Sequence, residues 1–204
     1  TDIVWDGIKK SYVGVGGILA RYWRAYGGYR ALFSSPYLHI SVLLAGAMYP
    51  FWLRESWWDT ALSTLPNVLG FTLAGFTIWL GFGDEKFRTL ISRAKPDRES
   101  PFMGVSAGFA HFVVVQILAL MAALWAKAMN FPLPTECWLR DHIRFVAIPG
   151  QYIGFLLFIY ALISALAATF GVLRAASWYD QHKRNGNDAG NVETPRMGEK
   201  HNSN

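Results

Sequence analysis

The sequence predicts an all-α integral membrane protein that crosses the bilayer four times. Four apolar stretches, residues 35–53, 61–82, 102–126 and 145–173, contain no Asp, Glu, Lys or Arg, although the chain has 14 acidic and 19 basic residues. The stretches are 19 to 29 residues long. A helix rises 1.5 Å per residue, and about 20 apolar residues cross a hydrocarbon layer of roughly 30 Å, so each stretch is long enough for a transmembrane helix.

The distribution of Lys and Arg predicts the orientation. The segments outside the spans hold five, one, five, three and five basic residues in chain order, which places 15 on one side and four on the other. Because basic residues near span ends are retained in the cytoplasm, we expect the N-terminus, the second loop and the C-terminus to be cytoplasmic. An even number of spans also requires both termini on one side. The expected location is a bacterial inner membrane.

The first segment, residues 1–34, is expected to lie against the cytoplasmic membrane surface. Apolar and aromatic residues recur in it at helical spacing, namely Ile18, Tyr22, Tyr26, Tyr29 and Phe33. This pattern predicts an interfacial amphipathic helix that has Arg21, Trp23 and Arg24 at the lipid interface and acts as an anchor or as a moving gate. Glycines weaken a helix by about 1 kcal/mol each relative to Ala, so we expect a bend or break between Val13 and Gly17.

The four-helix transmembrane domain is expected to cover residues 35–184. Trp57 and Trp58 stand at the outer end of the first two spans, where indole rings prefer the membrane interface. After the second span, Asp84 is placed to cap a short cytoplasmic helix. Its mixed charges form either a solvated face or a docking surface for a cytoplasmic protein, with Lys86, Arg88 and Arg93 as candidate contacts.

The remaining segments carry few apolar residues. The outer loop contains Cys137, the only cysteine, which is either free or links two copies. Residues 185–204 have almost nothing to bury and are expected to form a disordered cytoplasmic tail.

Polar residues within the spans are few and are the main candidates for a functional site. They are Asn67, Gln116, Gln151, His111 and His39. Hydrocarbon offers no hydrogen bonds, so such residues turn toward protein or water. We expect Asn67, Gln116 and Gln151 to form an outer polar layer, which either fixes helix register or lines a hydrated path. His39 and His111 lie in the inner half and would be weak candidates for a metal or proton site.

Small residues spaced by four predict close helix packing. The pairs are Gly70 with Ala74, Gly104 with Gly108, Gly150 with Gly154, and Ser164 with Ala168. Because there are several such faces, we expect a homo-oligomer. Residues 104–108 also spell G-x-S-x-G, but that nucleophile motif requires a strand, a turn and a helix, and here it falls inside a membrane helix.

Several classes of function have little support in the sequence. No charged residue lies within a span, as a proton-coupled or cation-coupled transporter requires. We find no credible catalytic motif and expect no metal and no cofactor. The net charge of +5 comes from residues beside membrane crossings, so the anionic leaflet is a nearer partner than nucleic acid.

Two functions of different class remain. The first is a small homo-oligomeric passive ion channel with uncharged spans and a polar layer. The second is a non-catalytic membrane-anchoring or sensor subunit that docks a cytoplasmic partner through its second loop.

Overall fold

The computed structural model describes residues 2–93, 99–130 and 139–192, and every regular element in these ranges is an α-helix. The helices are α1 (Asp2–Tyr26), α2 (Gly28–Phe33), α3 (Pro36–Ala47), α4 (Tyr49–Arg54), α5 (Trp57–Gly81), α6 (Glu85–Ile91), α7 (Pro101–Met129) and α8 (Leu139–Val192). The all-α prediction is therefore confirmed for the described residues.

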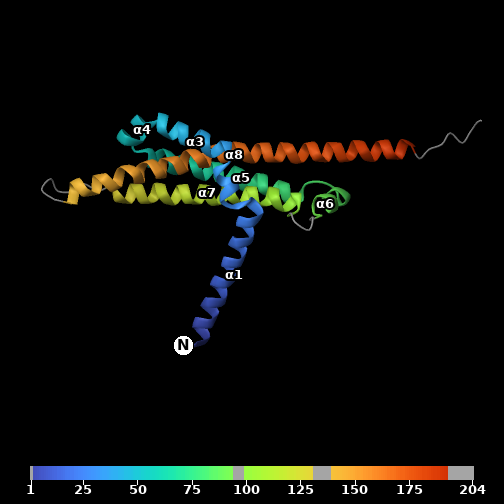
Figure 1. Ribbon diagram of the computed structural model, residues 1–204, viewed down its shortest axis with the longest axis horizontal. Helices are drawn as coiled ribbons and strands as arrows, with labels where there is room; N and C mark the ends of the chain where they lie inside the picture. Colours follow the sequence, from blue (N-terminus) through green and yellow to red (C-terminus); the bar gives the residue numbers. More distant parts are fainter. Residues whose placement is uncertain (1, 94–98, 131–138, 193–204) are drawn as a thin grey trace, which may run out of the picture.

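Three long helices form the body of the molecule. Figure 1 shows α5, α7 and α8 side by side along the long axis, with α3 and α4 against α8. Within these helices, Trp57–Gly81, Pro101–Met129 and Ala147–Asn185 are long and apolar enough to cross a membrane. They correspond to the second, third and fourth predicted spans.

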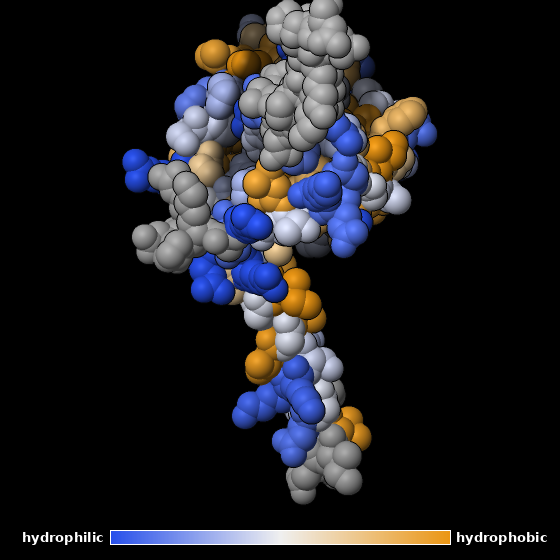
Figure 2. All heavy atoms as spheres, turned by 90° about the vertical axis from the view of Figure 1, so that its right-hand side faces the viewer, coloured by the Kyte–Doolittle hydropathy of each residue, from blue (hydrophilic) through white to orange (hydrophobic). Residues whose placement is uncertain are grey.

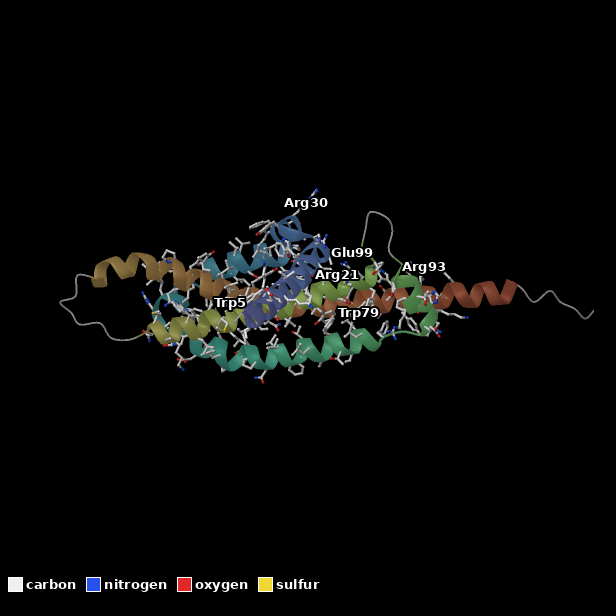
Figure 3. All side chains as sticks on the ribbon, turned by 90° about the horizontal axis from the view of Figure 1, so that it is seen from below. Trp5, Arg21, Arg30, Trp79, Arg93 and Glu99 are labelled. Carbon is white, nitrogen blue, oxygen red and sulfur yellow. The ribbon has the colours of Figure 1, made fainter. Side chains whose placement is uncertain are left out.

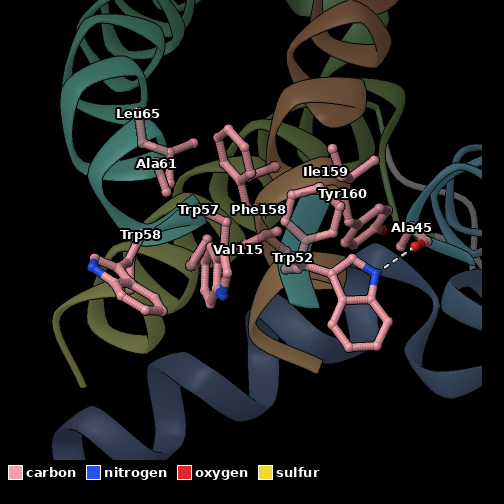
Figure 4. Packing of buried hydrophobic residues seen from close by; sticks show 14 residues of the cluster. Ala45, Trp52, Trp57, Trp58, Ala61, Leu65, Val115, Phe158, Ile159 and Tyr160 are labelled. Atoms are coloured by element: carbon pink, nitrogen blue, oxygen red, sulfur yellow. Dashed lines mark hydrogen bonds between the residues drawn. The ribbon is translucent and has the colours of Figure 1, made fainter. Parts of the chain in front are cut away.

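The first predicted span, residues 35–53, is not one continuous helix. It is divided into α3 and α4 at Met48. Pro50 explains the division, since proline donates no backbone hydrogen bond and its ring clashes with the carbonyl of the residue four positions earlier. The indole Nε1 of Trp52 donates to the Ala45 carbonyl oxygen at 2.8 Å, which satisfies a backbone acceptor beside the break (Figure 4).

The N-terminal segment also differs from its prediction. The expected break between Val13 and Gly17 is wrong, because α1 continues unbroken from Asp2 to Tyr26. Glycine lowers helix propensity without excluding the helical conformation. The chain turns instead at Gly27 and Gly28, whose φ angles of +103° and +63° are readily adopted only by glycine.

The helix α1 leaves the bundle crosswise. Figure 1 shows it extending away from the side of the long helices, and Figure 3, which looks toward its free end, labels Trp5 there. Most of its apolar side chains are exposed there, including Val4, Trp5, Tyr12, Val13 and Ile18. Figure 2 shows hydrophobic and hydrophilic residues together along this arm.

The core is divided into two clusters of buried residues. The larger cluster lies between α3, α4, α5, α7 and α8 and is rich in aromatic residues, with Trp52, Trp57, Phe155, Phe158 and Tyr160 among its buried members (Figure 4). The smaller cluster joins α5, α6, α7 and α8 around Trp79, Phe87 and Phe109.

The short helix predicted after the second span is present as α6. The Asp84 carboxylate accepts a hydrogen bond from the Phe87 backbone N–H at 2.9 Å, so the predicted cap is confirmed. The helix α8 extends past the bundle and reaches Val192, so part of the segment 185–204 is helical. Cys137 and residues 193–204 lie outside the described residues.

Replacing Gly154 tests the closest approach between α5 and α8. A Cβ atom at this position would stand 2.8 Å from Cη2 and Cζ2 of Trp57, which is fully buried. We expect the overlap in Gly154→Ala to cost about 1–3 kcal/mol in the free energy of unfolding. Unfolding of the purified protein in detergent, followed by circular dichroism, measures the change.

Gly150 on the same helix provides the matched control. A Cβ atom there would have no atom within 4 Å. Gly150→Ala is therefore expected to leave stability unchanged or to raise it by up to about 1 kcal/mol. Equal stability of the two variants would contradict the packing described here.

Candidate functional site

Two of the predicted polar residues are used to join helices. The Gln116 side chain on α7 is fully buried, and its Nε2 donates to Thr72 Oγ1 on α5 at 2.9 Å. Gln151 on α8 accepts a hydrogen bond through Oε1 from the indole Nε1 of Trp57. Gln151 thus contacts the beginning of α5 and Gln116 contacts its second half. The two amides do not contact each other.

Asn67 lies on the side of α5 that faces away from Gln116 and Gln151, and it is exposed there. Its Nδ2 donates to the Ser63 carbonyl oxygen of its own helix at 3.4 Å. A carboxamide has two donor hydrogens and a carbonyl acceptor, so this single bond leaves hydrogen-bonding capacity directed out of the bundle. Asn67 is therefore not part of an internal layer with Gln116 and Gln151.

Asn67 belongs to a continuous face of small and polar residues along α5, which we call the α5 polar face. Its members recur every three or four positions, all are exposed, and they are Thr60, Ser63, Asn67, Gly70, Ala74, Thr77 and Gly81. Residues at this spacing share one side of a helix. The buried residues Ala61, Leu65, Thr72 and Trp79 occupy the opposite side.

Among the described residues, the α5 polar face is left exposed. Only 17% of the apolar segment of α5 is buried, compared with 39% for each of the other two span-length helices. Ser63 and Thr77 donate their hydroxyl hydrogens to carbonyl oxygens of their own helix, at 3.0 and 2.9 Å. Their hydroxyl oxygens remain able to accept bonds from outside.

His111 lies at a second polar site, where α1 meets the bundle. Its Nδ1 is 2.8 Å from the Tyr22 hydroxyl, and its Nε2 is 3.0 Å from the Tyr160 hydroxyl. The Tyr26 ring stacks on the imidazole with the ring centroids 3.9 Å apart. Because a neutral imidazole donates through one nitrogen and accepts through the other, both bonds form together.

Burial raises the pKa of Tyr22 to about 12, so its hydroxyl keeps its proton at neutral pH. The sequence did not predict that Tyr22 and Tyr160 bond to His111. Tyr22 and Tyr26 were placed on the apolar side of an interfacial helix, and in the structure they contact His111 of α7. His39 does not reach this site, since its Nε2 bonds the Phe33 carbonyl oxygen at 2.9 Å.

The end of the bundle that carries α6 is charged. Lys183 on α8 pairs with the Asp84 carboxylate at 2.7 Å, and this pairing lowers the pKa of Asp84. Arg88 and Arg93, with Glu85, line a hollow of about 710 Å³ beside α6. Lys86 is exposed next to them, and Arg93 and Glu99 are visible at this end in Figure 3.

The residues predicted for helix packing and lipid contact lie in different surroundings. Gly154 packs against Trp57, whereas a Cβ atom at Gly70, Gly104, Gly108 or Gly150 would meet nothing within 4 Å. Ala74 is exposed on α5. Packing at these open positions therefore requires something outside the chain.

The tryptophans predicted at the membrane interface lie partly or wholly inside the molecule. Trp57 and Trp58 are buried in the larger core cluster, so within this chain they contact protein and not lipid. Trp23 is half-buried and packs edge-on against Tyr29, with ring centroids 4.9 Å apart. Arg21 and Arg24, beside it on α1, are exposed.

No group of three or more His, Cys, Asp or Glu residues that would hold a metal ion occurs in the described part of the chain. Comparison with known proteins gives no match to a family model, to a curated protein or to a solved structure.

Removing the Tyr22 hydroxyl tests the contact between α1 and α7. Tyr22→Phe loses the bond to His111 Nδ1, which is expected to weaken docking of α1 by about 0.5–1.5 kcal/mol. Amide hydrogen exchange in residues 18–26 should become several times faster.

Tyr12→Phe is the control, because Tyr12 is on the same helix and is 76% exposed. It should leave exchange in residues 18–26 unchanged. If both variants exchange equally fast, the hydroxyl of Tyr22 does not hold α1 in place.

Proposed function

We propose that the protein is a homo-oligomeric passive ion channel whose path is lined by the α5 polar faces of several copies. The observation that carries this proposal is the position of Asn67, exposed in the middle of a span-length helix and flanked along one face by hydroxyl and glycine residues. In hydrocarbon such groups find no partner, so they are favoured where they face water or another protein.

The composition of the α5 polar face supports a wet surface more than a dry one. Positions that border this face on α5 carry large exposed apolar residues, such as Phe71 at 80% and Ile78 at 66% exposure, so the polar groups are confined to a narrow stripe. Asn67 and the hydroxyls provide both donors and acceptors at intervals along the helix, which is what a partly dehydrated ion requires. The aromatic core of the single chain favours a path between copies over one within a copy.

The proposal includes the predicted topology. We take α3 with α4 as a fourth, broken crossing, since their 18 helical residues would rise about 27 Å if the two helices followed one axis. A broken helix is tolerated in a membrane where side chains satisfy the freed backbone groups, and the bond from Trp52 to Ala45 does so. The basic residues near α6 and in α1 support placing this end of the bundle and both termini in the cytoplasm.

Cysteine substitution along α5 tests the channel. In a Cys137→Ser background, Ser63→Cys, Asn67→Cys and Thr77→Cys should react with a charged, water-soluble thiosulfonate in liposomes, and the reaction should block ion flux. Asn67→Leu should lower flux about tenfold, because it removes the hydrogen-bonding group at the middle of the path and so raises the barrier by about 1.4 kcal/mol.

Leu73→Cys and Leu80→Cys are the controls, since both residues are exposed on α5 but lie outside the α5 polar face. They should remain unreactive, because lipid excludes the charged reagent. Absence of flux across monovalent cations and anions, or equal reactivity at all five positions, would reject the channel.

A docking function is the second candidate, and the charged hollow beside α6 supports it. Arg88 and Arg93 line this hollow at the bundle end where α8 extends beyond the span, and Figure 2 shows hydrophilic residues gathered at that end. Phe87 of α6 packs edge-on against Tyr179 of α8, and Asp84 at the start of α6 pairs with Lys183 of α8. A fixed, charged platform of this kind suits an acidic cytoplasmic protein.

Reversing the charges tests the docking function. Lys86→Glu, Arg88→Glu and Arg93→Glu together should abolish recovery of a specific protein that co-purifies from native membranes. The control is Lys9→Glu with Lys10→Glu, which changes charge on the exposed arm α1. If both variants recover the same proteins as the unmodified chain, this platform is not a docking surface.

A further inference from the structure

A groove between α7 and α8 has no role in the functions considered above. It has a volume of about 320 Å³. Small residues from both helices form much of it, and its lining includes Gly104, Gly108, Ala167, Ala168 and Gly171. A Cβ atom at any of the three glycines would meet nothing within 4 Å, so the absence of side chains keeps the groove open.

The length and position of the groove match one leaflet of a bilayer. It runs from Pro101 to Phe112 on α7 and from Ala167 to Trp178 on α8. Either interval spans about 16 Å of helix. Half of a hydrocarbon layer of roughly 30 Å is about 15 Å, so an acyl chain of one leaflet would fit along the groove.

The half of the groove nearer Trp178 carries a positive charge. Arg174 lines it and is exposed, and it is the first charged residue on α8 after the uncharged stretch 145–173. Among the described residues, the ion pairs do not include Arg174. A guanidinium group at the boundary between hydrocarbon and water is placed to bind a phosphate oxygen pair.

A second hollow adjoins this charged half. It has a volume of about 330 Å³ and shares Pro101 and Trp178 with the groove. Gln181 and His182 line it, and they provide hydrogen-bonding groups on the water side of Trp178. An indole ring at this level is typical of the membrane interface.

We propose that the groove binds a phospholipid with an anionic headgroup from the leaflet at the α6 end. One acyl chain lies along the glycine side of the groove, and the phosphate pairs with Arg174. The headgroup lies beyond Trp178, toward Gln181 and His182. The apolar part of the groove and the charge of Arg174 together favour a lipid. A free phosphate would pair with Arg174 but would leave the apolar part of the groove unfilled.

The test compares two lipids with the same acyl chains. The full-length protein is incubated in detergent with dioleoyl phosphatidylglycerol or dioleoyl phosphatidylcholine, and bound lipid is measured by native mass spectrometry. We expect about tenfold tighter binding of phosphatidylglycerol, and Arg174→Gln should remove this preference. Arg184→Gln is the matched control, because Arg184 lies further along α8, outside the groove, and pairs with Asp180 at 3.0 Å.

Filling the groove tests the position of the acyl chain. Gly108→Leu should lower retention of both lipids, whereas Gly150→Leu, at an open position outside the groove, should not. If Gly108→Leu fails to fold, Gly108→Ala should give a smaller decrease in the same direction.

Several outcomes would overturn the proposal. These are equal binding of the two lipids, equal effects of Arg174→Gln and Arg184→Gln, or full retention in both Gly108 variants. Disulfide-linked dimers of Gly108→Cys in membranes, in a Cys137→Ser background, would show that a second copy covers the groove instead of a lipid.

Discussion

The indole of Trp57 fixes how α5 sits against the rest of the bundle. It is fully buried at the start of α5, its ring rests on Gly154, and its Nε1 bonds Gln151 of the same neighbouring helix. A ring held on one side by a glycine and at its edge by an amide leaves α5 little freedom to rotate. The orientation of α5 follows from this contact, and with it the direction in which Asn67 points.

Further along the bundle, hydrogen bonds between polar side chains also fix how the helices pack. Gln116 holds α7 to α5 through Thr72, and His111 joins α7 to α8 and to α1. The Oε1 atom of Gln116 is buried without a hydrogen-bond partner among the described residues. Such a group costs about 1–3 kcal/mol unless water reaches it, so this contact favours one helix arrangement at some expense of stability.

Much of the architecture was predictable because it depends on composition. Absence of charge identified the segments that became α5, α7 and the central part of α8. The division between α3 and α4 was missed because the hydropathy of residues 35–53 is continuous, although Pro50 was the signal for it. The continuity of α1 was missed because counting glycines measures helix propensity and not the conformation that each glycine adopts.

The candidate site was predictable only in part, because depth along a span does not reveal which way a side chain points. Asn67, Gln116 and Gln151 were grouped by depth, but their partners depend on rotation about each helix. The helical spacing of Thr60, Ser63 and Thr77 around Asn67 predicts a shared polar face on one helix. Grouping residues by their depth in the membrane did not use this spacing. The contact of Tyr22 with His111 joins residues 89 positions apart, and no local pattern encodes it.

The length of α8 has a mechanical consequence. Its 54 residues form one helix that passes through the bundle and contacts α6 beyond it, where Tyr179 packs on Phe87 and Lys183 pairs with Asp84. Such a helix is about 80 Å long, so a tilt of about 10° around its middle would displace either tip by about 7 Å. A small change in packing around Trp57, where α5 contacts α8 at Gly154, would therefore become a larger displacement at the ends of α8.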